Sequence, residues 1–179
     1  MKTDDLISTL ASDSEWRTRP VGVWFVAALI AALPASMWMF MMSLGLRKDA
    51  MAAMHNPFFD LKFIVTIALA SVAIVISLHL SRPEVSLGKW AWILAIPLGL
   101  LGVGVASDLA VHGRAGWSGR LVGKNSIVCM TSIPFLALPF LAASLAALRR
   151  GAPSRPAIAG AFAGLLSAGL AATLYASHC

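Results

Sequence analysis

Five long apolar runs dominate this sequence of 179 residues, and none of them carries an acidic or basic side chain in its middle. The last run extends from Ala157 to Ala176 and follows a basic cluster at positions 149–155. About 20 helical residues, each rising about 1.5 Å, span the roughly 30 Å hydrocarbon layer of a bilayer. The sequence therefore predicts a protein that crosses a membrane several times.

Composition supports the same fold class. Hydrophobic residues make up 59% of the chain and charged residues 12%, values outside the range of ordinary soluble domains. We predict an all-α, polytopic membrane helix bundle over residues 21–179, preceded by a separate N-terminal segment, residues 1–20. The five expected spans are 21–45, 63–80, 90–107, 126–148 and 156–176. Two of the expected loops between these spans are residues 46–60 and 108–125. A stripe of Gly160, Gly164 and Ala168 predicts a face of close helix contact in the last span.

The N-terminal segment has the pattern of a short amphipathic helix. Asp4 and Asp5 would lie in its first turn, where carboxylates complement the positive end of the helix dipole. Leu6, Ile7 and Leu10 would share one face. So short a helix is marginal in water. It is expected either to lie on the membrane or on its own protein, or to fold on a partner.

The basic residues predict how the chain is oriented. If the N-terminus is inside, the inner segments hold eight lysines and arginines and the outer segments six. The inner ones are Lys2, Arg17, Arg19, Arg82, Lys89, Arg149, Arg150 and Arg155, and the outer ones are Arg47, Lys48, Lys62, Arg114, Arg120 and Lys124. This small excess favours a cytoplasmic N-terminus. Because these residues flank the spans, topology explains the net charge of +6, and no direct nucleic-acid contact is expected.

The two cysteines are predicted to share one side of the membrane. Cys129 and Cys179 each lie one crossing away from Arg149, and with a cytoplasmic N-terminus their side is the outer one. Three histidines are expected near the same face, as auxiliary metal ligands: His55, His112 and His178. Thiols and imidazoles suit soft and borderline metals, and a cysteine pair in an oxidising compartment can form a disulfide. Taken alone, however, Cys129 could equally be a small apolar residue of its helix.

Motifs of catalysis and transport are missing from the sequence. Pumps and transporters usually need ionisable groups within their spans, and these spans have none in their middles. A membrane disulfide oxidoreductase generally relays electrons between two cysteine pairs, whereas this chain has a single distant pair. Neither a nucleophile elbow nor a phosphate-binding glycine loop occurs. We therefore expect neither an enzyme nor a resident cofactor, only a transient heavy-metal ion at the cysteine pair.

Several segments together resemble the NrsF family of bacterial inner-membrane anti-sigma factors. They are Met1–Ala11, Asn56-Pro57-Phe58-Phe59 with Lys62, Cys129 followed by Ile133-Pro134 and Pro139, Leu148–Pro156, and Tyr175–Cys179. The resemblance implies that residues 1–20 hold a sigma factor of the extracytoplasmic-function type, through Asp4, Asp5, Leu6, Ile7 and Leu10. It also implies that Cys129 and Cys179 sense heavy metal or oxidant. The expected function is a membrane switch that releases its sigma factor under this stress.

Two further expectations accompany this resemblance. The family typically has six spans and this chain offers five, so a further helix is expected beyond Cys179. The competing functional class is a small membrane metal-binding or transport protein. A neighbouring sigma-factor gene would favour the regulator, and a metal-resistance pump cluster without one would favour transport.

Overall fold

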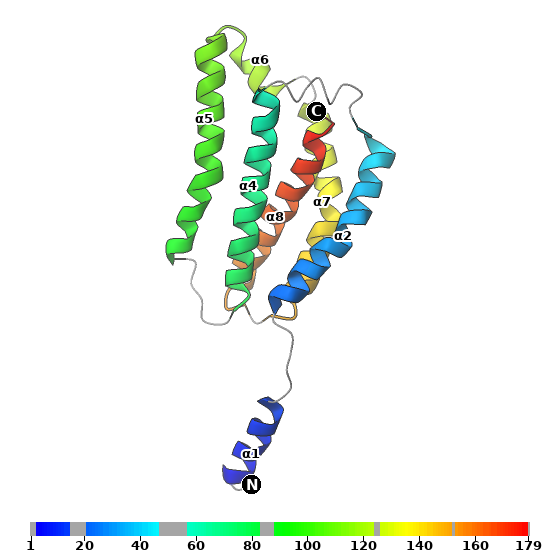
Figure 1. Ribbon diagram of the computed structural model, residues 1–179, viewed down its shortest axis with the longest axis vertical. Helices are drawn as coiled ribbons and strands as arrows, with labels where there is room; N and C mark the ends of the chain where they lie inside the picture. The colour runs from blue at the N-terminus through cyan, green and yellow to red at the C-terminus, as the bar shows by residue number, and fades with distance from the viewer. Residues whose placement is uncertain are drawn as a thin grey trace.

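The computed structural model describes residues 3–14, 21–46, 57–82, 88–123, 126–151 and 153–178. All regular structure in these ranges is helical, which confirms the predicted all-α class. The long helices are α2 (Val21–Ser43), α4 (Pro57–Leu80), α5 (Ala95–His112), α7 (Ser126–Leu148) and α8 (Pro156–Ala176). The shorter elements are α1 (Thr3–Ser14), the 3₁₀ helix η1 (Gly88–Leu94) and α6 (Trp117–Val122). Figure 1 shows α1 beyond one end of a bundle formed by the long helices.

Five helical segments of the described chain are long and apolar enough to cross a membrane, as predicted. The bounds expected for the last two spans, 126–148 and 156–176, coincide with α7 and α8. The first span, expected to end at residue 45, ends instead at Ser43. Gly45 adopts a left-handed φ of 70°, and its N–H donates to the carbonyl of Phe40, which closes the helix.

The second span was predicted to begin at residue 63, but α4 begins six residues earlier, at Pro57. Proline suits the first position of a helix, because its fixed φ is helical and its missing N–H would have no intrahelical acceptor there. Asp60 lies in the same first turn, where its charge complements the helix dipole. Helix α4 therefore begins within the range 46–60, which the sequence predicts to be a loop.

The third span, expected at 90–107, differs at both ends. Residues 88–94 form η1, and α5 begins at Ala95, two residues before Pro97. Pro97 lies in the first turn of α5, where its missing N–H removes no intrahelical hydrogen bond, so a helix that begins at Ala95 accommodates it. At the other end α5 continues to His112, and α6 follows within the range predicted to be a loop, 108–125. The left-handed φ of Gly113, 65°, ends α5.

Helix α8 lies at the centre of the packing. It packs against α4 and α7, α2 packs mainly on α7, and α5 lies outside α4 (Figure 1). The larger core cluster joins Phe25 of α2, Ile76 of α4, Phe140 of α7 and Leu166 of α8, all nearly inaccessible. In contrast, α5 buries only Pro97 and Gly104 among its residues. The bundle is thus a tight group of four helices with a looser fifth.

The predicted contact face of α8 is wrong at two of its three positions, Gly160 and Gly164. A Cβ added to Gly160 or Gly164 would meet nothing within 4 Å, so these glycines do not permit a close helix approach. Gly169 does, because its added Cβ would lie 3.1 Å from the backbone nitrogen of Ala70 and 3.2 Å from its Cα. The small residue that brings α4 and α8 together therefore lies one position beyond the predicted stripe.

Replacing Gly169 with leucine should destabilise the bundle, because the new side chain would meet the backbone of α4. We expect Gly169→Leu to lower the free energy of unfolding by about 1–3 kcal/mol, the usual cost of overpacking. Gly164→Leu, on the same helix but in open space, is the matched control. Denaturation of the purified chain in detergent measures both, and equal stability of the two variants would contradict the assigned contact.

Candidate functional site

The long helices run back and forth between the two ends of the bundle (Figure 1). Each predicted functional residue can therefore be assigned to one of these ends. We call the end where α2 and α8 begin and α4 and α7 end the α1 end, because α1 precedes it in the sequence. We call the opposite end, where α7 begins and α2, α5 and α8 end, the Cys129 end. The predicted sigma-binding helix and Cys129 therefore belong to opposite ends.

Helix α1 has the form that the sequence predicted. Asp4 and Asp5 lie in its first turn, and both are exposed. Ile7 is 59% exposed, which is high for a large apolar side chain on a polar helix. Leu6 and Leu10 occupy helical positions on either side of it, although their side chains lie outside the described set. Helix α1 thus presents two carboxylates and an exposed apolar side chain.

The predicted sensor residues are only partly within the described ranges. Cys129 lies in the first turn of α7 and is half-buried. Its predicted partner Cys179 and the predicted ligand His55 lie outside the described residues. Of the side chains that are described, no three from His, Cys, Asp and Glu gather closely enough to hold a metal ion. The pairing of the two cysteines stays a prediction.

His178 is the predicted ligand whose environment is best defined. Its Nδ1 lies 2.9 Å from the carbonyl oxygen of Gly45, at the end of α2. Because a carbonyl only accepts hydrogen bonds, Nδ1 must carry the proton. In a neutral imidazole Nε2 then keeps the lone pair that a metal would bind. A backbone carbonyl that fixes the tautomer in this way is a common support for histidine ligands.

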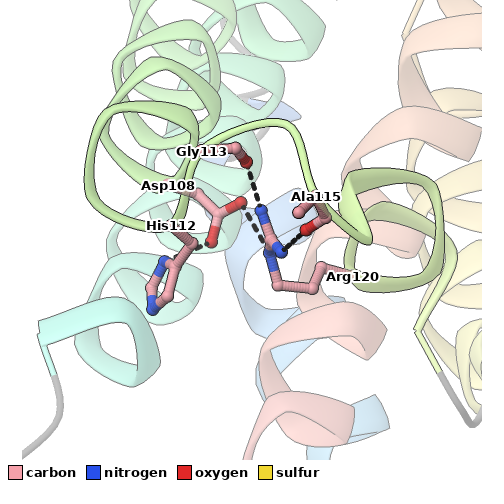
Figure 2. Close-up of polar contacts among 5 residues, drawn as sticks. All are labelled: Asp108, His112, Gly113, Ala115 and Arg120. Atoms are coloured by element: carbon pink, nitrogen blue, oxygen red, sulfur yellow. Dashed lines mark hydrogen bonds and ion pairs between the residues drawn. The ribbon is translucent and has the colours of Figure 1, made fainter.

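His112 belongs to a different polar cluster at the corner between α5 and α6 (Figure 2). Its Nδ1 lies 3.1 Å from Oδ1 of Asp108, one turn earlier on α5. The other carboxylate oxygen, Oδ2, accepts a hydrogen bond of 3.3 Å from Nε of Arg120. Arg120 also donates to the carbonyls of Ala115 and Gly113, at 2.6 and 2.8 Å. These contacts fasten α6 to the end of α5, so they have a structural role that sequence reasoning missed.

A second contact missed by sequence reasoning lies at the α1 end. The guanidinium carbon of Arg150, in the turn after α7, lies 4.0 Å from the ring centroid of Trp24 on α2. Cation–π pairs of this geometry are attractive. Nothing in the sequence signals the contact, because the two residues are far apart along the chain. It holds the beginning of α2, the helix that follows α1, against the turn between α7 and α8.

Contacts of α2 therefore occur along its whole length. Gly45 beyond its end contacts His178, and Trp24 near its beginning contacts Arg150. Between them the hydroxyl of Ser36, fully buried, donates to the carbonyl of Leu136 on α7 at 3.2 Å. Helix α2 thus connects the Cys129 end with the end from which α1 extends.

Fold and site together define a class: an all-helical protein whose described residues include five helices long and apolar enough to cross a membrane, with a further short helix that exposes two carboxylates and Ile7 outside the bundle. A family model described as "Negative regulator of sigma F" (NrsF) matches residues 10–179. The anti-sigma-F factor NrsF of Caulobacter vibrioides is 37% identical over 190 residues, which cover all of this chain and 85% of that protein. The probable anti-sigma-F factor NrsF of Azospira oryzae is 32% identical over 183 residues, covering all of this chain and 84% of that protein.

No solved structure significantly matches the chain. The sequence relatives suffice for classification: this chain belongs to the NrsF family. The resemblance to this family is thereby confirmed over most of the chain. The family is one of regulators, so the expectation of a protein other than an enzyme is confirmed as well.

Removal of the cation–π contact should loosen the beginning of α2. We expect Arg150→Gln to lower the free energy of unfolding in detergent by about 0.5–1 kcal/mol, the usual contribution of such a pair at an exposed site. Arg149→Gln removes the same charge from the neighbouring position, for which no aromatic contact occurs among the described residues. Equal losses in the two variants would mean that charge alone, and not the ring of Trp24, accounts for the effect.

Proposed function

We propose that this chain is an anti-sigma factor of the bacterial inner membrane. Residues 1–20 would hold an extracytoplasmic-function sigma factor in the cytoplasm, while Cys129 and Cys179 would sense heavy metal or oxidant at the outer face. Family membership supports the sigma-factor partner. The observation that carries the two-ended switch is the position of α1 and Cys129 at opposite ends of one bundle.

The exposed surface of α1 supports its assignment to sigma binding. A helix of 12 residues is marginal in water, and an apolar side chain such as Ile7 gains by leaving water. A protein partner that covers Leu6, Ile7 and Leu10 would stabilise the helix as it binds. Asp4 and Asp5 would add charge complementarity to a basic surface of the sigma factor.

Charge distribution supports the cytoplasmic position of α1. Among the described residues, the α1 end has five basic side chains, and the Cys129 end has three. The five are Arg82, Lys89, Arg149, Arg150 and Arg155, and the three are Lys62, Arg114 and Arg120. Basic residues are enriched on the cytoplasmic side of membrane proteins. With α1 inside, Cys129 faces the outer compartment, where metals and oxidants arrive first.

Metal chemistry supports the sensor. Thiolates bind soft metal ions strongly, and His178 directly precedes Cys179 in the sequence. With its Nδ1 proton directed to Gly45, the imidazole of His178 could add a nitrogen ligand to the two sulfurs. Oxidation would act on the same residues, because two thiols in reach of each other can form a disulfide. Either event would change the packing of α7 and α8 at the Cys129 end.

Helix α2 is the proposed route to the sigma factor. A shift of α8 would reach α2 through His178 and Gly45, and a shift of α7 would reach it through Leu136 and Ser36. Residues 15–20 then join α2 to α1. A coupling free energy of about 1–3 kcal/mol between the two ends would change sigma-factor affinity by about 5- to 150-fold. A contact rearrangement of this size is sufficient for a switch.

Sigma binding is tested on α1. We expect Ile7→Asp, and deletion of residues 1–20, to abolish copurification of the candidate sigma factor, because both remove the apolar surface. Ser8→Asp adds the same charge on the opposite face of the helix and should preserve binding. Retention of the sigma factor by the deletion variant would exclude α1 as the binding element.

Sensing is tested on the cysteines. Cys129→Ser or Cys179→Ser should abolish induction of a sigma-dependent reporter by Cd²⁺, because a hydroxyl is a poor ligand for a soft metal. Thr131→Ser, an equally small change at an exposed position of α7, should leave induction intact. If both cysteine variants respond like the unmodified chain, the thiols take no part in sensing.

A further inference from the structure

A pocket of about 400 Å³ lies between α4, α5 and α6, at the Cys129 end of the bundle. Its volume is within the range of sites that bind small molecules and lipids. Helices α4, α5 and α6 supply the residues that line it, among them Lys62 of α4, Asp108 of α5 and Arg120 of α6. None of them belongs to the proposed sensor or to α1, so the pocket requires its own explanation.

The pocket has mostly apolar walls and is partly open at the surface of the bundle. Leu61 and Val65 of α4 face Leu101 and Val105 of α5 across it. On one side of the pocket α4 and α5 are in contact. Gly104 has no side chain, and Leu61 occupies the space beside it: a Cβ added to Gly104 would lie 2.5 Å from Leu61 Cδ2. Leu101 lines the pocket and is nevertheless 52% exposed. A hydrocarbon chain can therefore enter from the bilayer.

Three charged side chains also line the pocket. Lys62, Asp108 and Arg120 line it and sum to a formal charge of +1 (two positive charges and one negative). Asp108 is balanced by its contacts with Arg120 and His112 (Figure 2). Among the described residues no ion pair involves Lys62. Three of the five N–H groups of Arg120 donate to protein acceptors. The uncompensated charge at the pocket is thus positive.

From this arrangement we propose that the pocket binds one anionic phospholipid of the surrounding bilayer. An acyl chain lies along the apolar walls, and the phosphate lies against Lys62 and the remaining N–H groups of Arg120. Trp117 suits the level of the head groups, where amphipathic aromatic rings are enriched. The lipid fills the gap between α5 and the tight group of four helices. This proposal goes beyond sigma-factor regulation and does not depend on it.

Lipid titration of the full-length chain in detergent, followed by native mass spectrometry, tests the proposal. We use phosphatidylglycerol and phosphatidylcholine with identical acyl chains. One phosphatidylglycerol per chain should bind about fivefold more tightly than phosphatidylcholine, as expected for one uncompensated basic residue. Lys62→Gln should remove this preference, and Lys62→Arg should keep it. Arg114→Gln, a charge loss at the same end but away from the pocket, should also keep it.

Filling the pocket provides a second measurement. Leu101→Trp should weaken binding of both lipids, because the larger ring occupies the space of the acyl chain. Equal affinity for the two lipids would overturn the proposal, as would equal effects of Lys62→Gln and Arg114→Gln. Displacement of the lipid by glycerol phosphate at matched concentration would overturn it too, since a head group alone would then account for binding.

Discussion

In a hydrocarbon layer every backbone N–H and C=O group must find its partner within the protein, because no water is available to replace it. A chain whose apolar runs are each about one bilayer long satisfies this condition by forming helices that cross and return. The residues that end those helices, such as Gly45 and Gly113, then fix which side chains meet at each end. Because each long helix crosses from one end of the bundle to the other, α1 and Cys129 belong to opposite ends.

Closely packed helices connect the two ends of the bundle. Helix α8 contacts α4 so closely at Gly169 that a single added carbon would meet the backbone of Ala70. Closely packed interiors respond to strain by discrete rearrangement and not by gradual deformation. Helix α2 rests on this core through Ser36 and continues toward α1. These contacts are the basis for the proposed coupling between the Cys129 end and α1.

The sequence predicted the long spans well, because an uncharged apolar run of this length has few alternatives in a membrane. It failed where polar residues satisfy one another through tertiary contacts: Asp108, His112 and Arg120 indicated a loop, yet they form a helix end and a short helix. It also failed at Gly169, because the rotation of a helix against its neighbours depends on packing that an apolar run does not encode. The contact of Arg150 with Trp24 has no local signal at all.

The proposed switch requires that the two ends of the bundle are energetically coupled. The most direct measurement is the affinity of the sigma factor for the full-length chain in lipid nanodiscs, with and without saturating Cd²⁺. If the ends are coupled, Cd²⁺ will weaken sigma-factor binding by about 5- to 150-fold, and the sigma factor will weaken Cd²⁺ binding by the same factor. Sigma-factor affinity that stays unchanged while Cd²⁺ is bound would contradict the proposed coupling.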